Sequence, residues 1–266
     1  MNPDAYLDFA RRLQAGLEAD KRVLGLVFAG SSAQQSHIPD EWSDHDFFVV
    51  TADGVQEGFR TSYEWLPDHE QIVLTVRETE HGLKILYASG HMLEFAIFNL
   101  EEVGRARLND YTVAFDRGGL AVAAGAIASS VPAPELTPAD IQRHVGMALC
   151  LLLVGAGRVA RGEGISGQVF IRSHTLHHLL PVLEQTLPAA DKSALDNLDP
   201  LRRFERVFPA VGAQINAALN RDAIGAAMGI LDVIEQVLGD KADFPTAAAA
   251  TVRSVLKRAA HSEAAH

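Results

Sequence analysis

Two aspartates separated by one residue, Asp44 and Asp46, stand at the start of a short apolar segment in the N-terminal half of the sequence. Side chains two positions apart on a strand point to the same face of a sheet, so both carboxylates are expected on one face. Carboxylates held that close repel each other unless a cation lies between them, and hard divalent cations prefer oxygen ligands. The spacing therefore predicts a cation site, with Mg²⁺ bridging to a nucleoside triphosphate as its natural occupant.

A Gly-Ser turn, Gly30-Ser31, precedes the aspartates by twelve intervening residues and follows an apolar run. Gly30 allows the backbone to turn sharply and lets a ligand approach the main chain closely. Ser31 can offer its hydroxyl and its N–H to a phosphate oxygen. The residues after it, beginning with Ser32, can start a helix whose free N–H groups favour anions. We therefore expect Gly30, Ser31 and Ser32 to take part in nucleotide binding.

A third carboxylate is then expected from a neighbouring strand, and Glu94 in the segment MLEFAIF is the candidate. A charged residue in an apolar strand is costly unless it has a partner or a role. Two roles stay open for Glu94: a third metal ligand, or a general base that takes a proton from an attacking hydroxyl. The structural alternative is an ion pair with Lys84 across a hairpin.

Other candidate residues have simpler explanations. His45, between the two aspartates, is expected to point to the opposite face and to pack there. The histidines of HTLHH (174–178) have a spacing that can suit zinc, but the glutamate of the metalloprotease pattern is missing. The glycine-rich segment 155–164 follows a predicted helix instead of a strand, so it fails the context of a dinucleotide fingerprint. Cys150 has apolar neighbours and is predicted to be a small buried core residue.

The elements that must position these residues follow from the spacing of apolar side chains. Residues 3–20 carry them at helical spacing. Short apolar runs predict buried strands at 23–28, 47–50 and 71–76, and residues 83–98 predict a hairpin that turns at Ser89-Gly90. The candidate site residues therefore lie at the ends of strands or within them.

The composition changes at residues 129–140, where three prolines in a polar stretch indicate a linker. Beyond it the sequence predicts helices, the first with Thr137 as N-cap and Pro138 in its first turn. Further helices are expected at about 166–187, 200–220, 222–239 and 245–260, with Pro200 and Pro209 at helix starts. The whole pattern predicts an α+β protein with an N-terminal α/β domain (1–130) and a C-terminal α-helical bundle domain (131–266).

The composition bounds the classes of partner. The 266 residues carry a formal net charge of −11 and no block of Lys or Arg, which argues against a nucleic-acid surface. The sequence has no run of about eighteen uncharged apolar residues, so no membrane span is expected. The N-terminal segment lacks the features of a signal peptide. With a single cysteine, a cytoplasmic location is expected.

The N-terminal part of the chain, about the first 100 residues, resembles the DNA-polymerase-beta-like nucleotidyltransferase superfamily. The resemblance rests on the site residues Gly30, Ser31, Asp44, Asp46 and Glu94, in this order. Within that superfamily the chain is similar to the small antibiotic nucleotidyltransferases, nearest to the lincosamide type. The features that support this second resemblance are the two-domain layout and the segments SDHDFFV, LEFAIFNLEEV, VAFDRGGL and ARGE. The resemblance implies a mixed sheet in the N-terminal domain.

The resemblance also implies roles for the site residues. Asp44 and Asp46 would hold Mg²⁺ against the triphosphate, and Gly30 and Ser31 would cradle its phosphate oxygens. Glu94 would act as base for the acceptor hydroxyl or complete the metal site. The helical half would build the acceptor pocket. A homodimer, in which the second subunit closes the cleft, is a further implication.

The leading functional hypothesis is an enzyme that moves AMP, or another NMP, from an NTP to a hydroxyl of a small molecule, with ATP the expected donor. A lincosamide or an aminoglycoside antibiotic is a candidate acceptor. Two alternatives stay open: a nucleotidyltransferase that modifies a protein, and a non-catalytic nucleotide-binding module that kept the fold. His45 departs from the apolar or Tyr residue usual in the family at that position.

Overall fold

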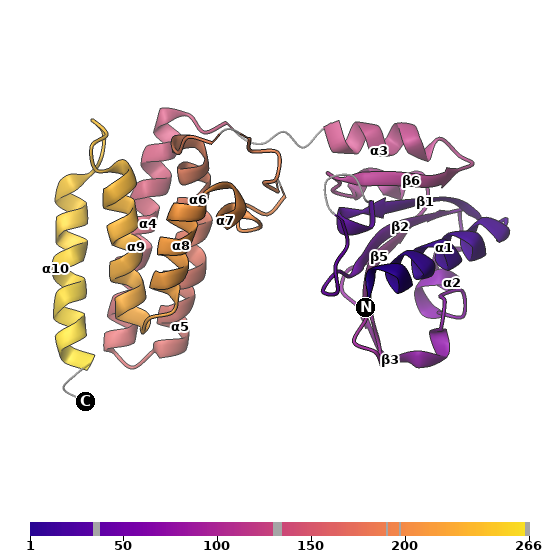
Figure 1. The fold of residues 1–266 in the computed structure, drawn as a ribbon, viewed down its shortest axis with the longest axis horizontal. Coiled ribbons are helices and arrows are strands. Elements are labelled where there is room, and N and C mark those ends of the chain that lie inside the picture. The colour runs from indigo at the N-terminus through magenta and orange to yellow at the C-terminus, as the bar shows by residue number, and fades with distance from the viewer. Residues whose placement is uncertain (34–37, 130–134, 190, 197, 264–266) are drawn as a thin grey trace. The chain divides into compact units, whose positions relative to one another are not determined.

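The structure is a computed structural model, which describes residues 1–33, 38–129, 135–189, 191–196 and 198–263. The chain divides into two compact units, Met1–Pro132 and Ala133–His266, called here the N-terminal unit and the helical unit. The first contains a mixed sheet with helices and the second is built from helices (Figure 1). The predicted α+β class is therefore confirmed.

The sheet of the N-terminal unit has six strands in the order β3-β4-β5-β2-β1-β6. β2 and β5 run parallel, and the other neighbours are antiparallel. The strands are β1 (Val23–Ala29), β2 (His45–Thr51), β3 (Ile72–Arg77), β4 (Gly82–Tyr87), β5 (Met92–Phe98) and β6 (Tyr111–Asp116). All the strands predicted from apolar runs are present. β6 was not predicted, because its residues are half-buried or exposed and form no apolar run.

The two faces of the sheet are covered differently. Apolar side chains of α1 (Pro3–Ala19) and α2 (Gln56–Thr61) pack on one face, with Phe47 and Phe95 of the sheet among their partners. α3 (Leu120–Ser129) packs with a smaller cluster on the other face. Short helices at η1 (Gly30–Ala33), η2 (His69–Gln71) and η3 (Glu102–Arg105) connect these elements. The second face is therefore the less completely covered one.

The segment VAFDRGGL ends β6 and starts α3, and Asp116 makes that junction. Its carboxylate accepts hydrogen bonds from the backbone N–H groups of Gly118, Gly119, Leu120 and Ala121, at 2.8–3.0 Å. Hydrogen bonds from these N–H groups, with Ala121 the largest contributor, lower the pKa of Asp116. The segment is thus explained by a helix cap.

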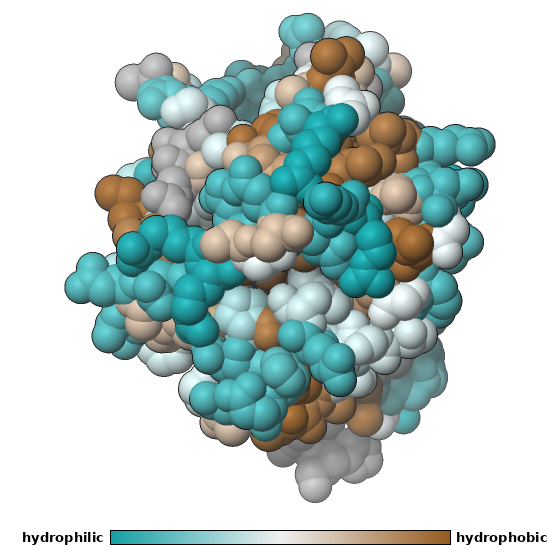
Figure 2. All heavy atoms as spheres, turned by 90° about the vertical axis from the view of Figure 1, so that its right-hand side faces the viewer, coloured by the Kyte–Doolittle hydropathy of each residue, from teal (hydrophilic) through white to brown (hydrophobic). Residues whose placement is uncertain are grey.

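Strand β3 lies at the edge of the sheet and exposes Val73, Leu74 and Val76. On the face of the molecule drawn in Figure 2, hydrophobic residues are separated by hydrophilic ones. Charged residues such as Arg77 at the end of this strand are a common means of protecting an edge from pairing with another chain.

The helical unit is a bundle around a leucine- and alanine-rich core. Its elements are α4 (Pro138–Ala160), α5 (Gly164–Gln168), the π-helix η4 (Val169–His174), α6 (Thr175–Thr186), α7 (Phe204–Val207), α8 (Pro209–Leu219), α9 (Ala223–Leu238) and α10 (Thr246–Glu263). Thr137 and Asp140 form a capping box at the start of α4, as predicted for Thr137.

The helix predicted for residues 200–220 is wrong in its first part. Arg203 has a left-handed backbone (φ 64°), and only the four-residue α7 follows it before Pro209 starts α8. Asp196 and Asp199 accept bonds from the N–H groups of Leu198 and Leu201, which builds turns before α7. Local side-chain bonds of this kind compete with a helix, so Pro200 does not start one.

Two further expectations concern α4 and the segment before it. Of the predicted linker, 129–140, residues 130–134 lie outside the described residues, Ser129 ends α3, and residues 138–140 already belong to α4. Cys150 is exposed, so its predicted burial is wrong: Leu149 and Leu152 face the core, and Cys150 lies on a different side of the helix. Among the described helices, α4 alone is long and apolar enough to cross a membrane by length and composition, while its buried face belongs to the core.

Candidate active site

The three predicted carboxylates converge on one side of the sheet. Asp46 of β2 and Glu94 of β5 are direct partners in the parallel pair, and Asp44 lies two residues before Asp46. One carboxylate oxygen from each residue lies within 4.8 Å of the other two, and all three residues are half-buried. Three oxygen donors at this spacing form the kind of ligand set that a hard divalent cation prefers.

Gly30 stands where the end of β1 meets Asp46. Its φ is +53°, in the left-handed region, and a Cβ at this position would lie 2.9 Å from Oδ2 of Asp46. The pairing of Ala29 with Asp46 between β1 and β2 brings the two residues together. A glycine is therefore needed both for the turn and for the close approach of the carboxylate.

Tyr6 of α1 ties the Gly-Ser turn to the aspartates. Its hydroxyl donates to the backbone carbonyl of Asp44 at 2.8 Å and lies 2.6 Å from Oγ of Ser32. Because the Tyr6 proton is used on Asp44, the Ser32 hydroxyl donates to Tyr6, and its oxygen accepts the N–H of Asp46 at 3.1 Å. The Ser32 hydroxyl thus holds the loop together, and the half-buried Ser31 is the serine side chain closer to solvent.

Tyr6 is fully buried and keeps its proton. Burial, with a smaller contribution from the charges of Asp46 and Asp44, raises the pKa of Tyr6 to about 12, although hydrogen bonds with Ser31 and Ser32 act in the opposite sense. Nothing in the sequence around Tyr6 marks this role, because the residue lies more than twenty positions from the turn it supports. The helical spacing of residues 3–20 predicts only that Tyr6 lies on the apolar face of a helix.

His45 packs on the face opposite the carboxylates, as predicted. Its ring stacks on Tyr6 with 3.6 Å between centroids. Nε2 of His45 lies 3.1 Å from the Tyr6 carbonyl, and Nδ1 lies 2.7 Å from Nε2 of His91. Because a carbonyl only accepts, His45 carries its proton on Nε2, and Nδ1 accepts from His91. Burial is the largest cause that lowers the pKa of His45 to about 3 and that of His91 to about 4.

Lys84 of β4 contacts Glu94, so the structural alternative considered for Glu94 is also present. Nζ of Lys84 lies 3.2 Å from Glu94 Oε2 and 3.1 Å from Glu78 Oε1. Hydrogen bonds to Glu78 first, and then to Glu94, raise the pKa of Lys84. The carboxylate of Glu94 is therefore shared between the acidic cluster and an ammonium group.

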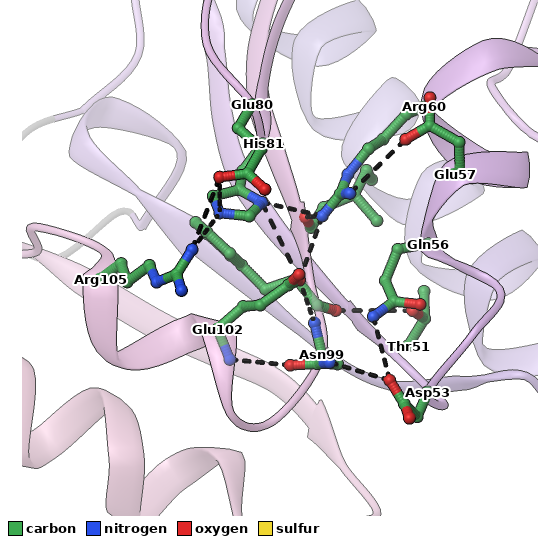
Figure 3. Close-up of polar contacts among 12 residues, drawn as sticks. Thr51, Asp53, Gln56, Glu57, Arg60, Glu80, His81, Asn99, Glu102 and Arg105 are labelled. Carbon is green, nitrogen blue, oxygen red and sulfur yellow. Dashed lines mark hydrogen bonds and ion pairs between the residues drawn. The ribbon is translucent and has the colours of Figure 1, made fainter.

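A second polar cluster, the Arg60 cluster, consists of Arg60 with His81, Glu102 and their neighbours (Figure 3). The Arg60 side chain is only 7% exposed. Its Nη2 donates to the Ile97 carbonyl at 2.7 Å, to Glu102 at 3.1 Å and to Nδ1 of His81 at 2.9 Å. The Glu102 carboxylate also accepts from the N–H of Asn99 at 3.1 Å. This cluster fastens α2 to β5 and η3.

The remaining sequence candidates lie in the helical unit. Within HTLHH, His178 contacts His144 with 3.2 Å between their Nδ1 atoms. Among the described residues the only metal-like group of three or more ligands is that of Asp44, Asp46 and Glu94. In the glycine-rich segment 155–164, Arg161 is the C-cap of α4 and pairs with Glu163 at 3.1 Å, so this segment ends a helix.

The helical unit also contains a cavity of about 720 Å³. It is bounded by the start of α4, the end of α6 and the segment between α9 and α10. Its lining combines apolar residues such as Ile141, Val145 and Phe244 with the charged Lys241 and Asp243. Volume and lining of this kind are typical of small-molecule sites.

Comparison with known proteins found no matching family model and no matching curated protein. Among solved structures, an aminoglycoside 6-adenyltransferase from Bacillus subtilis is 11% identical and has a TM-score of 0.35, over 94% of this chain and 96% of that one. A STING-associated CdnE c-di-GMP synthase from Capnocytophaga granulosa is 12% identical and has a TM-score of 0.31, over 98% of this chain and 80% of that one. At these TM-scores, the function of this chain has to be argued from its own site.

Proposed function

We propose that this protein is a nucleotidyltransferase that moves AMP, or another NMP, from an NTP to a hydroxyl of a small molecule. The observation that carries the proposal is the convergence of Asp44, Asp46 and Glu94 within 4.8 Å, beside the turn at Gly30. An Asp-x-Asp pair or a Gly-Ser turn alone would not support this function, whereas the three carboxylates together with the turn do. A cytoplasmic location belongs to the same proposal.

The donor set fits a divalent metal ion, and Mg²⁺ is the proposed one. Carboxylate oxygens from two neighbouring strands, half-buried and close together, suit a hard cation. When bound, the metal would supply charge stabilisation for the attacking and the leaving oxygens of an in-line displacement. Asp44 and Asp46 would hold it, with Glu94 as the third ligand or as the base.

The protein's own residues would do the rest. Gly30 leaves the main chain open to the triphosphate, and Ser31 supplies a hydroxyl and an N–H to phosphate oxygens. The acceptor oxygen forms a bond to the α-phosphorus, the bond from the α-phosphorus to the bridging oxygen breaks, and pyrophosphate leaves. As a base, Glu94 would take the proton from the acceptor hydroxyl. Its side chain is 46% exposed, which supports access from solvent.

The acceptor is proposed to bind the helical unit. The cavity of about 720 Å³ supports this, because it is large enough for a drug-sized molecule and offers both apolar and charged contacts. Lincosamides and aminoglycosides carry the hydroxyl groups that the reaction needs, so an antibiotic acceptor and a role in resistance are the specific form of the proposal. A homodimer is proposed as well.

The test is pyrophosphate release from ATP or GTP with Mg²⁺ over a panel of lincosamides, aminoglycosides and proteins, followed by mass spectrometry of the acceptors. We expect a mass increase of one NMP on a small molecule. We expect Asp46→Asn to lower the rate by about 100-fold or more, since it removes a metal ligand. Wild-type rates for Asp46→Asn would contradict the assignment. A labelled protein instead, or nucleotide binding without any turnover, would favour one of the two alternatives.

A further inference from the structure

Three charged side chains lie in register across neighbouring strands. Asp46 of β2 is paired with Glu94 of β5, and Glu94 is paired with Lys84 of β4. The ammonium of Lys84 lies between two carboxylates, 3.2 Å from Glu94 and 3.1 Å from Glu78. Glu78 follows the end of β3, and its N–H is bonded to the Gly82 carbonyl at 3.0 Å, which places it beside the start of β4.

We infer that Lys84 is a positioning residue that competes with the metal ion for Glu94, and that Glu78 is the second partner to which the ammonium withdraws when the metal binds. The inference rests on the metal site of the proposed function. It deepens that proposal by naming what governs the occupation of the site by the metal. Lys84 touches neither the nucleotide nor the acceptor in this role.

The physical reason is the sharing of one carboxylate by two cations. An oxygen of Glu94 that is hydrogen-bonded to an ammonium group is a poorer metal ligand, and a positive charge close to a divalent cation repels it. The Lys84 side chain is 35% exposed. Its ammonium can therefore move without opening the core. Glu78 offers a carboxylate already in contact, so the ammonium can leave Glu94 without losing its ionic partner.

The two neighbours of Glu94 therefore predict effects of opposite sign. Lys84→Met removes the competitor and should tighten metal binding by about tenfold, the size that Coulomb's law gives for a divalent and a monovalent cation about 6 Å apart in water. Glu78→Gln removes the alternative partner, so Lys84 holds Glu94 more firmly, and metal binding should weaken. In the double variant the effect of Glu78→Gln should largely disappear, because it acts through Lys84.

The experiment is calorimetric titration of the full chain with Mn²⁺, without nucleotide, for the wild type and for each variant. Lys21→Met is the matched control: it removes the same charge from an exposed turn between α1 and β1 and should leave the affinity nearly unchanged. Lys84→Arg keeps the charge and should stay near wild type. Thermal unfolding of each variant checks that it is folded.

The outcomes separate the two proposals. Suppose that the wild type binds Mn²⁺ and that Asp46→Asn abolishes this binding. Unchanged or weaker Mn²⁺ binding in Lys84→Met would then overturn the role of Lys84 and leave the proposed function intact. An equal gain in Lys21→Met would also overturn it, because the effect would then be one of overall charge. If the wild type bound no Mn²⁺ at millimolar concentration, both the metal site and this inference would be lost.

Discussion

The N-terminal unit contains two polar clusters that handle negative charge in opposite ways. In the Arg60 cluster each glutamate contacts a guanidinium: Glu102 with Arg60, Glu57 with Arg77 and Glu80 with Arg105. In the other cluster Asp44, Asp46 and Glu94 approach one another instead. The first arrangement is complete within the protein. The second brings carboxylates close together, with Lys84 as a partner of Glu94, and is the donor set of the proposed metal site. The proposed function therefore assigns structure to the first cluster and chemistry to the second.

The same contrast extends to burial and to the elements involved. Arg60 is buried and donates to a main-chain carbonyl, so it holds α2 on the sheet. The carboxylate cluster lies on the less covered face, open at Glu94 and supported from behind by Tyr6 and His45. Losing a member of the Arg60 cluster should therefore reduce stability, and losing a member of the carboxylate cluster should reduce activity.

The largest stability effect is expected from Glu102→Ala. This change removes the closest carboxylate from the buried Arg60 guanidinium and leaves only the longer contact with the exposed Glu57, at 3.6 Å. Breaking a buried ion pair by removing one partner costs about 3 kcal/mol or more. Chemical denaturation would measure the loss. Glu80→Gln, which breaks the exposed pair with Arg105, is the control and should change little. Asp46→Asn should not lose stability in this way. If it did so as strongly as Glu102→Ala, the contrast between the clusters would fail.

The next effect concerns acid. Because the pKa values of His45 and His91 are lowered by burial to about 3 and about 4, both are neutral in the folded protein and protonate more readily when it unfolds. Stability is therefore complete above pH 6.5 and falls as the pH decreases towards 4, by about 1.4 kcal/mol per pH unit for each proton excluded. Denaturation midpoints across this range would show the slope.

The control for the acid effect is His91→Phe, which keeps an aromatic ring beside Phe9 and Tyr87 but removes one titrating group. Its slope between pH 6.5 and 4 should be shallower than that of the wild type. An equal slope would mean that acid destabilisation arises elsewhere, and that the support behind the carboxylate cluster is not sensitive to pH.

A smaller stability effect, but one specific to the site, is expected from Gly30→Ala. An alanine in the left-handed region costs about 1–2 kcal/mol, and the added Cβ would meet Asp46 Oδ2 at 2.9 Å. Stability and Mn²⁺ affinity should therefore both fall.

Gly90→Ala is the matched control, since Gly90 also has a positive φ (+84°) but nothing within 4 Å of its Cβ position. It should lose stability alone. Equal Mn²⁺ binding in both variants would separate Gly30 from the site.

The sequence predicted the parts of the structure that depend on short-range periodicity. The strand around Phe47 and the hairpin around Ser89-Gly90 were readable because apolar side chains recur along them. The common face of Asp44 and Asp46 follows from the two-residue period of a strand. The approach of Glu94 to Asp46 additionally needed the parallel pairing of β2 with β5. The spacing predicted only that a neighbouring strand would supply the third carboxylate, and the resemblance implied only a mixed sheet.

What the sequence did not predict depends on contacts between distant residues or on local competition. Tyr6 reaches Asp44 from a helix 38 positions earlier, and in the Arg60 cluster the hydrogen bond between Arg60 and Glu102 joins residues 42 positions apart. Arg203 was predicted to lie in a helix over residues 200–220 that starts at Pro200, whereas turns at Asp196 and Asp199 replace the first part of that helix. Cys150 was judged by its neighbours in sequence, although the helical period puts adjacent residues on different sides.

The register between β2 and β5 has a consequence for how errors in folding affect the site. If β5 shifted by one residue, Glu94 would enter the space that Leu93 and Phe95 fill against α1, and an ionised group would be sealed in hydrocarbon. Such a chain would not complete its core. Core packing and the alignment of the carboxylates therefore depend on the same register. A chain with misaligned carboxylates would fail to fold, so it would not persist as a folded but inactive protein.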